Sequence, residues 1–136
     1  MKLLPPGQIR QLVEMAEQAR TALGKYAGYN VAYDSTALQL LDEWIEHHLR
    51  QFPQPSQKMR LLWASFLGEV FRRRHEGEWV IQERDGNEGL IVLCPSAGEA
   101  QRPVDVVGQV NRRVAQGMAA SLVLFYTLAS IELKAS

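Results

Sequence analysis

The sequence predicts an α+β fold in which about five helices pack around a two-stranded antiparallel β-hairpin. Two observations support this prediction. Apolar residues recur at three- and four-residue steps over several segments of helical length, and one alternating segment is joined by turn residues to a continuous β-prone run. With 136 residues, of which 46% are hydrophobic and 22% charged, residues 1–136 have the size and composition of a single globular domain.

The first predicted helix covers about residues 8–25 and follows a Pro-Pro-Gly turn. Six apolar residues at helical spacing give it one buried stripe: Ile9, Leu12, Val13, Ala16, Ala19 and Leu23. A second helix is predicted for about residues 35–51, because Asp34 and Ser35 form a capping pair in front of it. Prolines within residues 51–57 end this helix, since the residue before a proline avoids helical backbone angles.

A third helix, over about residues 57–76, is predicted to lie at the centre of the fold. One broad face is apolar, and it consists of Met59, Leu62, Trp63, Phe66, Leu67, Val70 and Phe71. Ala64 and Gly68 stack on another face, where small residues let a second element approach closely. We expect Gly77 to supply the left-handed backbone position that ends the helix. The three arginines at 72–74 lie in the last turn, where cations meet the exposed carbonyl groups favourably.

The hairpin is predicted from two runs and the turn between them. Apolar and polar residues alternate in "EWVIQER" at 78–84, whereas "LIVLC" at 90–94 is continuously β-prone. The intervening "DGNEG" at 85–89 is rich in turn-forming residues. Because an isolated two-stranded hairpin is only marginally stable, we expect helices or a partner chain to cover it.

Two further helices are predicted beyond the hairpin. Pro103 suits the first turn of a helix over about residues 103–116. Residues 119–133 leave two interpretations open, because "LVLFY" favours a strand whereas the length and the alanines favour a buried helix. We expect a helix there.

Composition limits the classes of partner. The 15 Lys and Arg residues balance 15 Asp and Glu residues, so the chain lacks the basic footprint of a nucleic-acid binder and we expect no nucleic-acid partner. No run of eighteen apolar residues occurs, so we expect no membrane span. Cys94 is the only cysteine and is expected to act as a small buried hydrophobe. The expected location is cytoplasmic.

No catalytic motif is present in the sequence, which leaves enzymatic activity uncertain and favours a non-enzyme. Glu43 and His47 are four residues apart on one helix and could ligate a metal together. A solvated pair is the favoured interpretation, because His47 falls on the exposed side of that helix. His75 lies at a helix end, among side chains that point in different directions. We therefore expect no metal site and no cofactor.

Glu69 is the strongest candidate for a functional side chain. It lies on the flank of the apolar face of the third helix, and Arg73 follows one turn later as its expected partner. In a structural role, Glu69 would help to fix this helix to the hairpin beside Trp79. In a functional role, it would form the polar end of a small-molecule pocket with tryptophan walls. The candidate ligand-binding residues are Glu69, Arg73, Trp79 and Trp63.

The run "FLGEVFRRRHEGEW", followed some forty residues later by "SLVLFY", resembles small uncharacterised bacterial domain-of-unknown-function families. In those families a Leu-Gly-Glu helix is followed by Gly-x-Trp, which opens a strand. The resemblance covers about residues 35–126, and its motif residues are Leu67, Gly68, Glu69, Gly77 and Trp79. It implies a compact α+β domain in a bacterial cytoplasm and assigns no catalytic residue.

These observations favour a non-enzymatic protein-binding or self-assembly module. The alternative is a small-molecule-binding pocket or minor enzyme centred on Glu69, Arg73 and Trp79. A homodimer is expected, because the apolar "LIVLC" strand needs cover on both faces and a net charge of zero opposes self-association only weakly. The expected contact lies at the edge of that strand or at the tyrosine-rich connection between the first two helices.

Overall fold

A computed structural model describes residues 1–98 and 100–135. It confirms the α+β class, with five α-helices and a four-stranded antiparallel sheet. The elements are, in chain order, β1 (Lys2–Leu3), α1 (Pro6–Ala27), α2 (Ser35–Gln51), α3 (Gln57–Arg74), β2 (Glu78–Arg84), β3 (Asn87–Cys94), β4 (Arg102–Val104), α4 (Val106–Gln116), the 3₁₀-helix η1 (Gly117–Ala120) and α5 (Leu122–Ala135).

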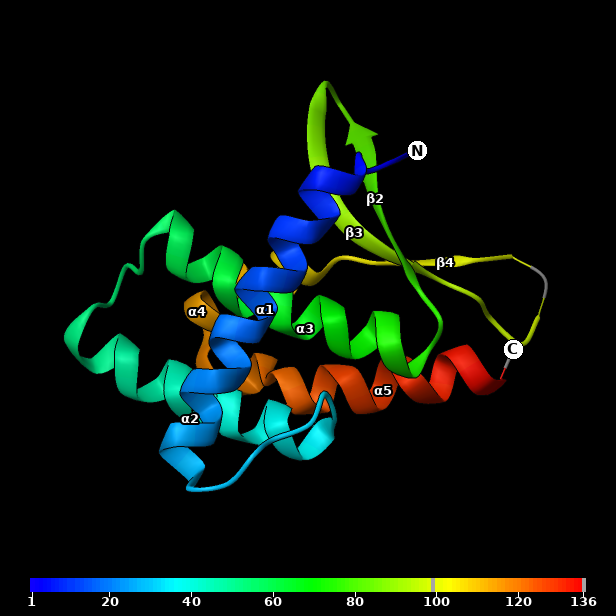
Figure 1. Cartoon of the computed structure of the whole chain (residues 1–136). Helices are drawn as coiled ribbons and strands as arrows, with labels where there is room; N and C mark the ends of the chain where they lie inside the picture. Colours follow the sequence, from blue (N-terminus) through cyan, green and yellow to red (C-terminus); the bar gives the residue numbers. More distant parts are fainter. Residues whose placement is uncertain (99, 136) are drawn as a thin grey trace.

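The sheet has the strand order β1-β2-β3-β4, and every neighbouring pair is antiparallel. The predicted hairpin is its main part, with pairs that run from Glu78↔Leu93 to Arg84↔Asn87. Figure 1 shows this hairpin extending away from the helices, with the N-terminus beside it. The sheet is larger than predicted, because β1 adds to the edge of β2 and β4 adds to the edge of β3.

The prediction that Pro103 starts the fourth helix is wrong. Pro103 pairs with Leu93 in the short edge strand β4, where the missing N–H of proline is tolerated. The helix α4 begins at Val106 instead, and its N-cap is Asp105, whose Oδ1 accepts a hydrogen bond from the amide of Gly108 at 2.9 Å. Asp105 is a stronger N-terminal signal than the proline two residues before it.

Helix α3 lies at the centre of the fold, as predicted. It crosses the molecule behind α1 (Figure 1), and every residue from Trp63 to Phe71 is buried. Gly68 allows the closest approach of the sheet, because a Cβ atom at this position would lie 2.0 Å from Cη2 of Trp79. The indole of Trp79 therefore rests on the helix backbone.

The C-terminus of α3 differs from the prediction for Gly77. The left-handed residue is Glu76, with φ of 53°, and the amide of Gly77 donates to the carbonyl of Arg72 at 3.0 Å. Gly77 is required for a different reason, since a Cβ atom there would lie 2.6 Å from Cγ1 of Val92 on β3. The glycine lets the chain turn directly against the sheet.

The segment with two open interpretations is helical, and α5 meets the preceding α4–η1 segment at a bend of 98°. Within residues 1–98 and 100–135, no single helix is long and apolar enough to cross a membrane. Taken together, the two bent helical segments Val106–Ala120 and Leu122–Lys134 are long and apolar enough, by length and composition only.

Candidate functional site

Glu69 lies between α3 and the first strand of the hairpin, and its side chain is fully buried. Both of its oxygens accept hydrogen bonds from Arg72, with Nε at 2.6 Å from Oε2 and Nη2 at 2.7 Å from Oε1. Nε of Arg73 donates to Oε1 at 3.1 Å, and Nε1 of Trp79 donates to Oε2 at 2.9 Å. These four bonds fill the acceptor capacity of the carboxylate.

The surroundings of Glu69 keep it ionised. Burial alone would raise the pKa of this carboxyl group, but the hydrogen bonds from Arg72, Trp79 and Arg73 outweigh burial and hold the pKa below its ordinary value. The two arginine side chains are about one third exposed, so their positive charges remain in contact with water. The cluster ties the helix α3 to the sheet.

The structure brings together three of the four residues that the sequence singles out. Glu69, Arg73 and Trp79 are in direct contact, whereas Trp63 lies elsewhere on α3 with its ring against Trp44 and His48. The ring centroids of those two contacts are 6.2 Å and 5.2 Å apart. Trp63 and Trp79 therefore do not form the walls of one pocket, and a ligand at Glu69 would have to displace an existing donor.

The sequence interpretation missed Arg72, which makes the bidentate bond to Glu69. The available signal was its spacing, because a residue three positions after Glu69 lies on the same side of the helix as one four positions after it. The sequence favours Arg73 because it lies nearer to the core-facing side of the helix and follows Glu69 by four residues, which is the favourable order for an acid and a base.

A second buried polar cluster joins α2, α4 and the start of α5. The Arg113 side chain is fully buried, and its Nε donates to Oδ1 of Asp42 at 2.9 Å, while one Nη nitrogen donates to Glu46 at 2.8 Å. The carboxylate of Asp42 also accepts from the amides of Leu122 and Val123 at 3.0 and 3.1 Å. Asp42 thus caps α5 from another helix.

The spacing of α4 held a signal for this second cluster. Arg113 follows Val106 and Val110 at helical steps, so it occupies a position on the core-facing side of α4. A charge in such a position requires a buried partner. The sequence alone does not say which carboxylate that is, because Asp42 lies 71 residues away.

Burial shifts the pKa of both Cys94 and His75. Burial raises the pKa of the Cys94 thiol to about 12, so the nucleophilic thiolate is scarce at neutral pH. Burial and the nearby Lys134 lower the pKa of His75, whose Nε2 lies 2.9 Å from the hydroxyl oxygen of Ser130. In the described part of the chain, no three His, Cys, Asp or Glu side chains gather in a way that could hold a metal ion.

One face of α5 carries large apolar side chains that stand in solvent. Leu124, Leu128 and Ile131 are 49%, 54% and 57% exposed. Their spacing of four and three residues places them in one stripe on the helix, which we call the α5 stripe. Leu122 and Leu133 face the core of the protein instead. Two-sided apolar character explains why the sequence of this helix shows no clear amphipathic pattern.

Comparison of the chain with protein-family models, with curated proteins and with solved structures finds no match.

Proposed function

We propose that this protein is a non-enzymatic self-assembly module that pairs with a second copy of itself through the α5 stripe. The observation that carries the proposal is the exposure of Leu124, Leu128 and Ile131, each about half exposed, on one side of one helix. Single exposed apolar residues are common on soluble proteins, but a contiguous apolar stripe is typical of an interaction surface.

A second copy of the chain is the simplest occupant of this stripe. In a two-fold symmetric dimer the same surface contributes from both subunits, so an apolar stripe is complementary to itself. The chain has a formal net charge of zero, so two copies repel one another little. The edge of the "LIVLC" strand is a poorer contact, because β4 already pairs with Val92–Cys94.

The expected strength of this contact is moderate. Full burial of Leu or Ile contributes about 1.5–3 kcal/mol, and these side chains are already about half buried. The six side chains of a symmetric contact therefore contribute roughly 6 kcal/mol together, which is comparable with the lower end of the cost of association, about 4–15 kcal/mol. Groups that flank the stripe must supply the remaining binding free energy. Because the net affinity is moderate, the fraction of dimer is expected to rise with protein concentration.

Two features support a non-enzymatic role. The Glu69 carboxylate has its acceptor capacity filled by four hydrogen bonds. The buried Cys94 thiol remains protonated at neutral pH. Neither group is therefore available as a base or nucleophile.

Size-exclusion chromatography with light scattering tests the proposal, over roughly 10 µM to 1 mM protein. The wild-type chain is expected to shift from monomer to dimer as its concentration rises, whereas Leu128→Glu remains monomeric. The matched control is Leu3→Glu, since Leu3 is 64% exposed but lies on β1. A wild-type monomer at the highest concentration would refute the proposal. Loss of the dimer with Leu3→Glu alone would assign the contact to the sheet edge.

A further inference from the structure

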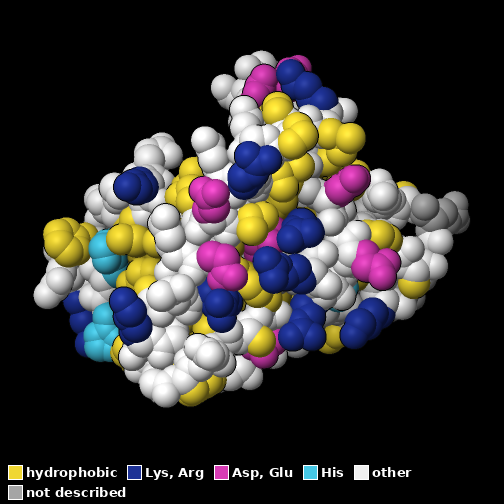
Figure 2. Space-filling view, viewed as in Figure 1, with side chains coloured by type: hydrophobic (Ala, Val, Ile, Leu, Met, Phe, Trp, Pro, Cys, Tyr) yellow, Lys and Arg dark blue, Asp and Glu magenta, His cyan; other side chains and the backbone are white. Residues whose placement is uncertain are grey.

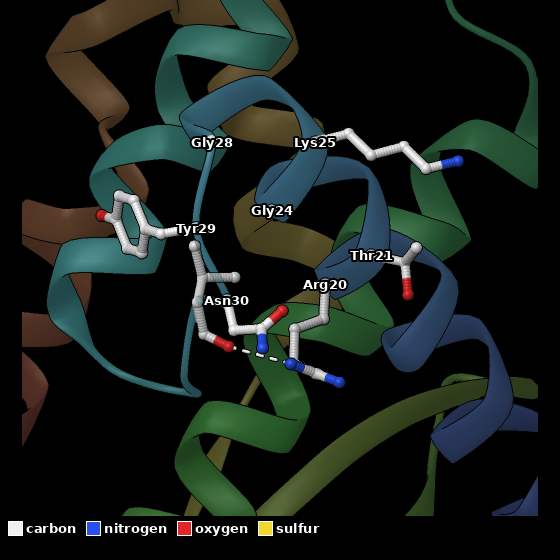
Figure 3. Close-up of a pocket in the computed structure, with 8 residues that line it drawn as sticks. Arg20, Thr21, Gly24, Lys25, Gly28, Tyr29 and Asn30 are labelled. Atoms are coloured by element: carbon white, nitrogen blue, oxygen red, sulfur yellow. Dashed lines mark hydrogen bonds between the residues drawn. The ribbon is translucent and has the colours of Figure 1, made fainter.

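An open groove lies where α1, the connection at residues 28–33 and the C-terminal end of α3 meet. It consists of two adjoining cavities of about 430 and 550 Å³, which share Arg20 and Val31 as lining residues. Figure 3 shows the first cavity, in which the Arg20 side chain points from α1 toward the connection near Asn30. The second cavity continues to the end of α3. We call the whole surface the arginine groove.

The second cavity is positively charged although the chain as a whole is neutral. Arg20, Arg73 and Arg74 line it, together with only one acidic residue, Glu17. Figure 2 shows several Lys and Arg side chains near the centre of the face on which α1 lies, with Asp and Glu side chains among them. A concave surface with an excess of positive charge attracts anions.

The guanidinium groups are held in place before any ligand arrives. Nε of Arg74 donates to the carbonyl of Tyr33 at 2.8 Å, and Nε of Arg73 donates to Glu69 at 3.1 Å. Nη1 of Arg20 donates to the carbonyl of Val31 at 3.0 Å. Among the residues that the structure describes, the terminal nitrogens of Arg73 and Arg74 have no hydrogen-bond partner. The guanidinium groups of Arg73 and Arg74 can therefore bind a ligand with little loss of side-chain entropy.

Tyr33 provides a second, independent indication of a ligand. Its ring stacks on Phe66 at 5.0 Å between centroids and lies 4.1 Å from the guanidinium carbon of Arg73. Its hydroxyl lies beside Glu17 and Arg20, and the structure shows no partner for it within the described ranges 1–98 and 100–135. Only 6% of this residue is exposed. An unsatisfied buried hydroxyl destabilises the folded state.

The hydroxyl of Tyr33 is available as a donor. Burial and the nearby Glu17 carboxylate raise its pKa to about 12, so it keeps its proton at neutral pH. The ion pair between Glu17 and Arg20 lies near this hydroxyl. A ligand anion that replaces Glu17 as the partner of Arg20 would bring an acceptor oxygen to this hydroxyl.

We propose that the arginine groove binds a small phosphate-bearing molecule. Phosphate oxygens would accept hydrogen bonds from Arg20, Arg73 and Arg74, while the rest of the molecule extends past Val31 toward Asn30. Three guanidinium groups from two helices suit the three oxygens of a phosphate monoester better than the two of a carboxylate. The two cavities have volumes in the range that small-molecule sites occupy. The groove does not include the α5 stripe, so this inference is independent of self-assembly.

Isothermal titration calorimetry with pyrophosphate as the probe tests this site. Saturable binding to wild-type protein is expected, with roughly tenfold weaker binding for Arg74→Gln and for Arg20→Gln, because each loses one charge-assisted hydrogen bond. The matched control is Arg10→Gln, since Arg10 is exposed on α1 outside the groove. Its affinity should stay within about twofold of wild type. Absence of saturable binding, or equal weakening by Arg10→Gln, would overturn the proposal.

Tyr33→Phe separates a ligand site from a structural tyrosine. Removing an unsatisfied hydroxyl should leave the melting temperature unchanged or raise it, while pyrophosphate binding weakens. A lower melting temperature with unchanged binding would contradict the proposed role of Tyr33. A short single-stranded oligonucleotide is titrated in parallel. Saturable binding of the oligonucleotide without binding of pyrophosphate would overturn the assignment to a small molecule.

Discussion

The Glu69 carboxylate shows how a charge can be kept inside this protein. Its desolvation is offset by bonds from Arg72, Arg73 and Trp79, and the two arginines retain contact with water. This arrangement is less costly than a fully buried ion pair, because only one of the partners is withdrawn from solvent. The outcome is a link between helix and sheet that depends on the charge of Glu69.

Glu69→Gln is expected to lower the free energy of unfolding by about 1–3 kcal/mol, because charge-assisted bonds are replaced by weaker ones. The folded-state pKa of Glu69 lies below the ordinary value of 4.5. The contribution of ionised Glu69 to the free energy of unfolding is therefore present above about pH 4.5, and it is lost as the pH falls through the folded-state pKa. Urea unfolding at neutral and acidic pH measures this. The exposed Glu43→Gln serves as control, and an equal loss for both variants would contradict the role of Glu69.

The end of α3 yields a prediction about Glu76, the residue that has the left-handed conformation in place of Gly77. Glu76→Gly should stabilise the protein by about 0.5–1 kcal/mol, because it relieves a left-handed conformation that costs a non-glycine residue about 1–2 kcal/mol. Gly77→Ala should destabilise it, because its Cβ would lie 2.6 Å from a methyl group of Val92. Thermal unfolding of both variants measures this. A stabilising Gly77→Ala would contradict the described turn.

At the scale of elements, spacing and capping signals placed the first three helices well. The second helix was predicted at 35–51 and observed at Ser35–Gln51, and Asp34 caps it through a bond to the amide of Ala37 at 2.9 Å. These boundaries are local properties of the chain. The short edge strands β1 and β4 were not foreseen, because two or three residues carry no periodic signal and pair only after the hairpin exists.

The start of α5 depends on a side chain from another helix. Asp42→Ala should destabilise the protein by about 3–5 kcal/mol, since it leaves the buried charge of Arg113 without its main partner and uncaps α5. Adding Arg113→Met to this variant should recover part of the loss, because the uncompensated charge is then removed. Glu46→Gln should cost less than 1 kcal/mol, as the Glu46 side chain is 46% exposed.

The double-mutant cycle in urea measures this coupling. Additive losses for Asp42→Ala and Arg113→Met would show that the two residues act independently and would contradict the cluster. The sequence could indicate that Arg113 needs a partner, but the identity of Asp42 depends on how α2, α4 and α5 pack together. Such long-range pairing lies beyond what a single sequence specifies.

At the scale of the whole molecule, the two proposed functions use separate surfaces. The α5 stripe consists of apolar side chains, whereas the arginine groove lies between α1 and the end of α3. The sequence predicted that Arg73 belongs to a polar site, but it did not predict the groove. Arg20, Tyr33 and Arg74 come from three separate segments, and only the fold brings them together.

Cross-linking at the middle of the α5 stripe tests self-assembly most directly. In a symmetric contact the two-fold axis passes near the centre of the stripe, where Thr127 is exposed. Thr127→Cys is treated with a short bismaleimide and compared with Lys58→Cys, an exposed position at the start of α3. Cys94 is buried and should not react. Covalent dimer from Thr127→Cys, well above that from Lys58→Cys, is the expected result; equal yields from both variants, or no dimer from either, would contradict pairing through α5.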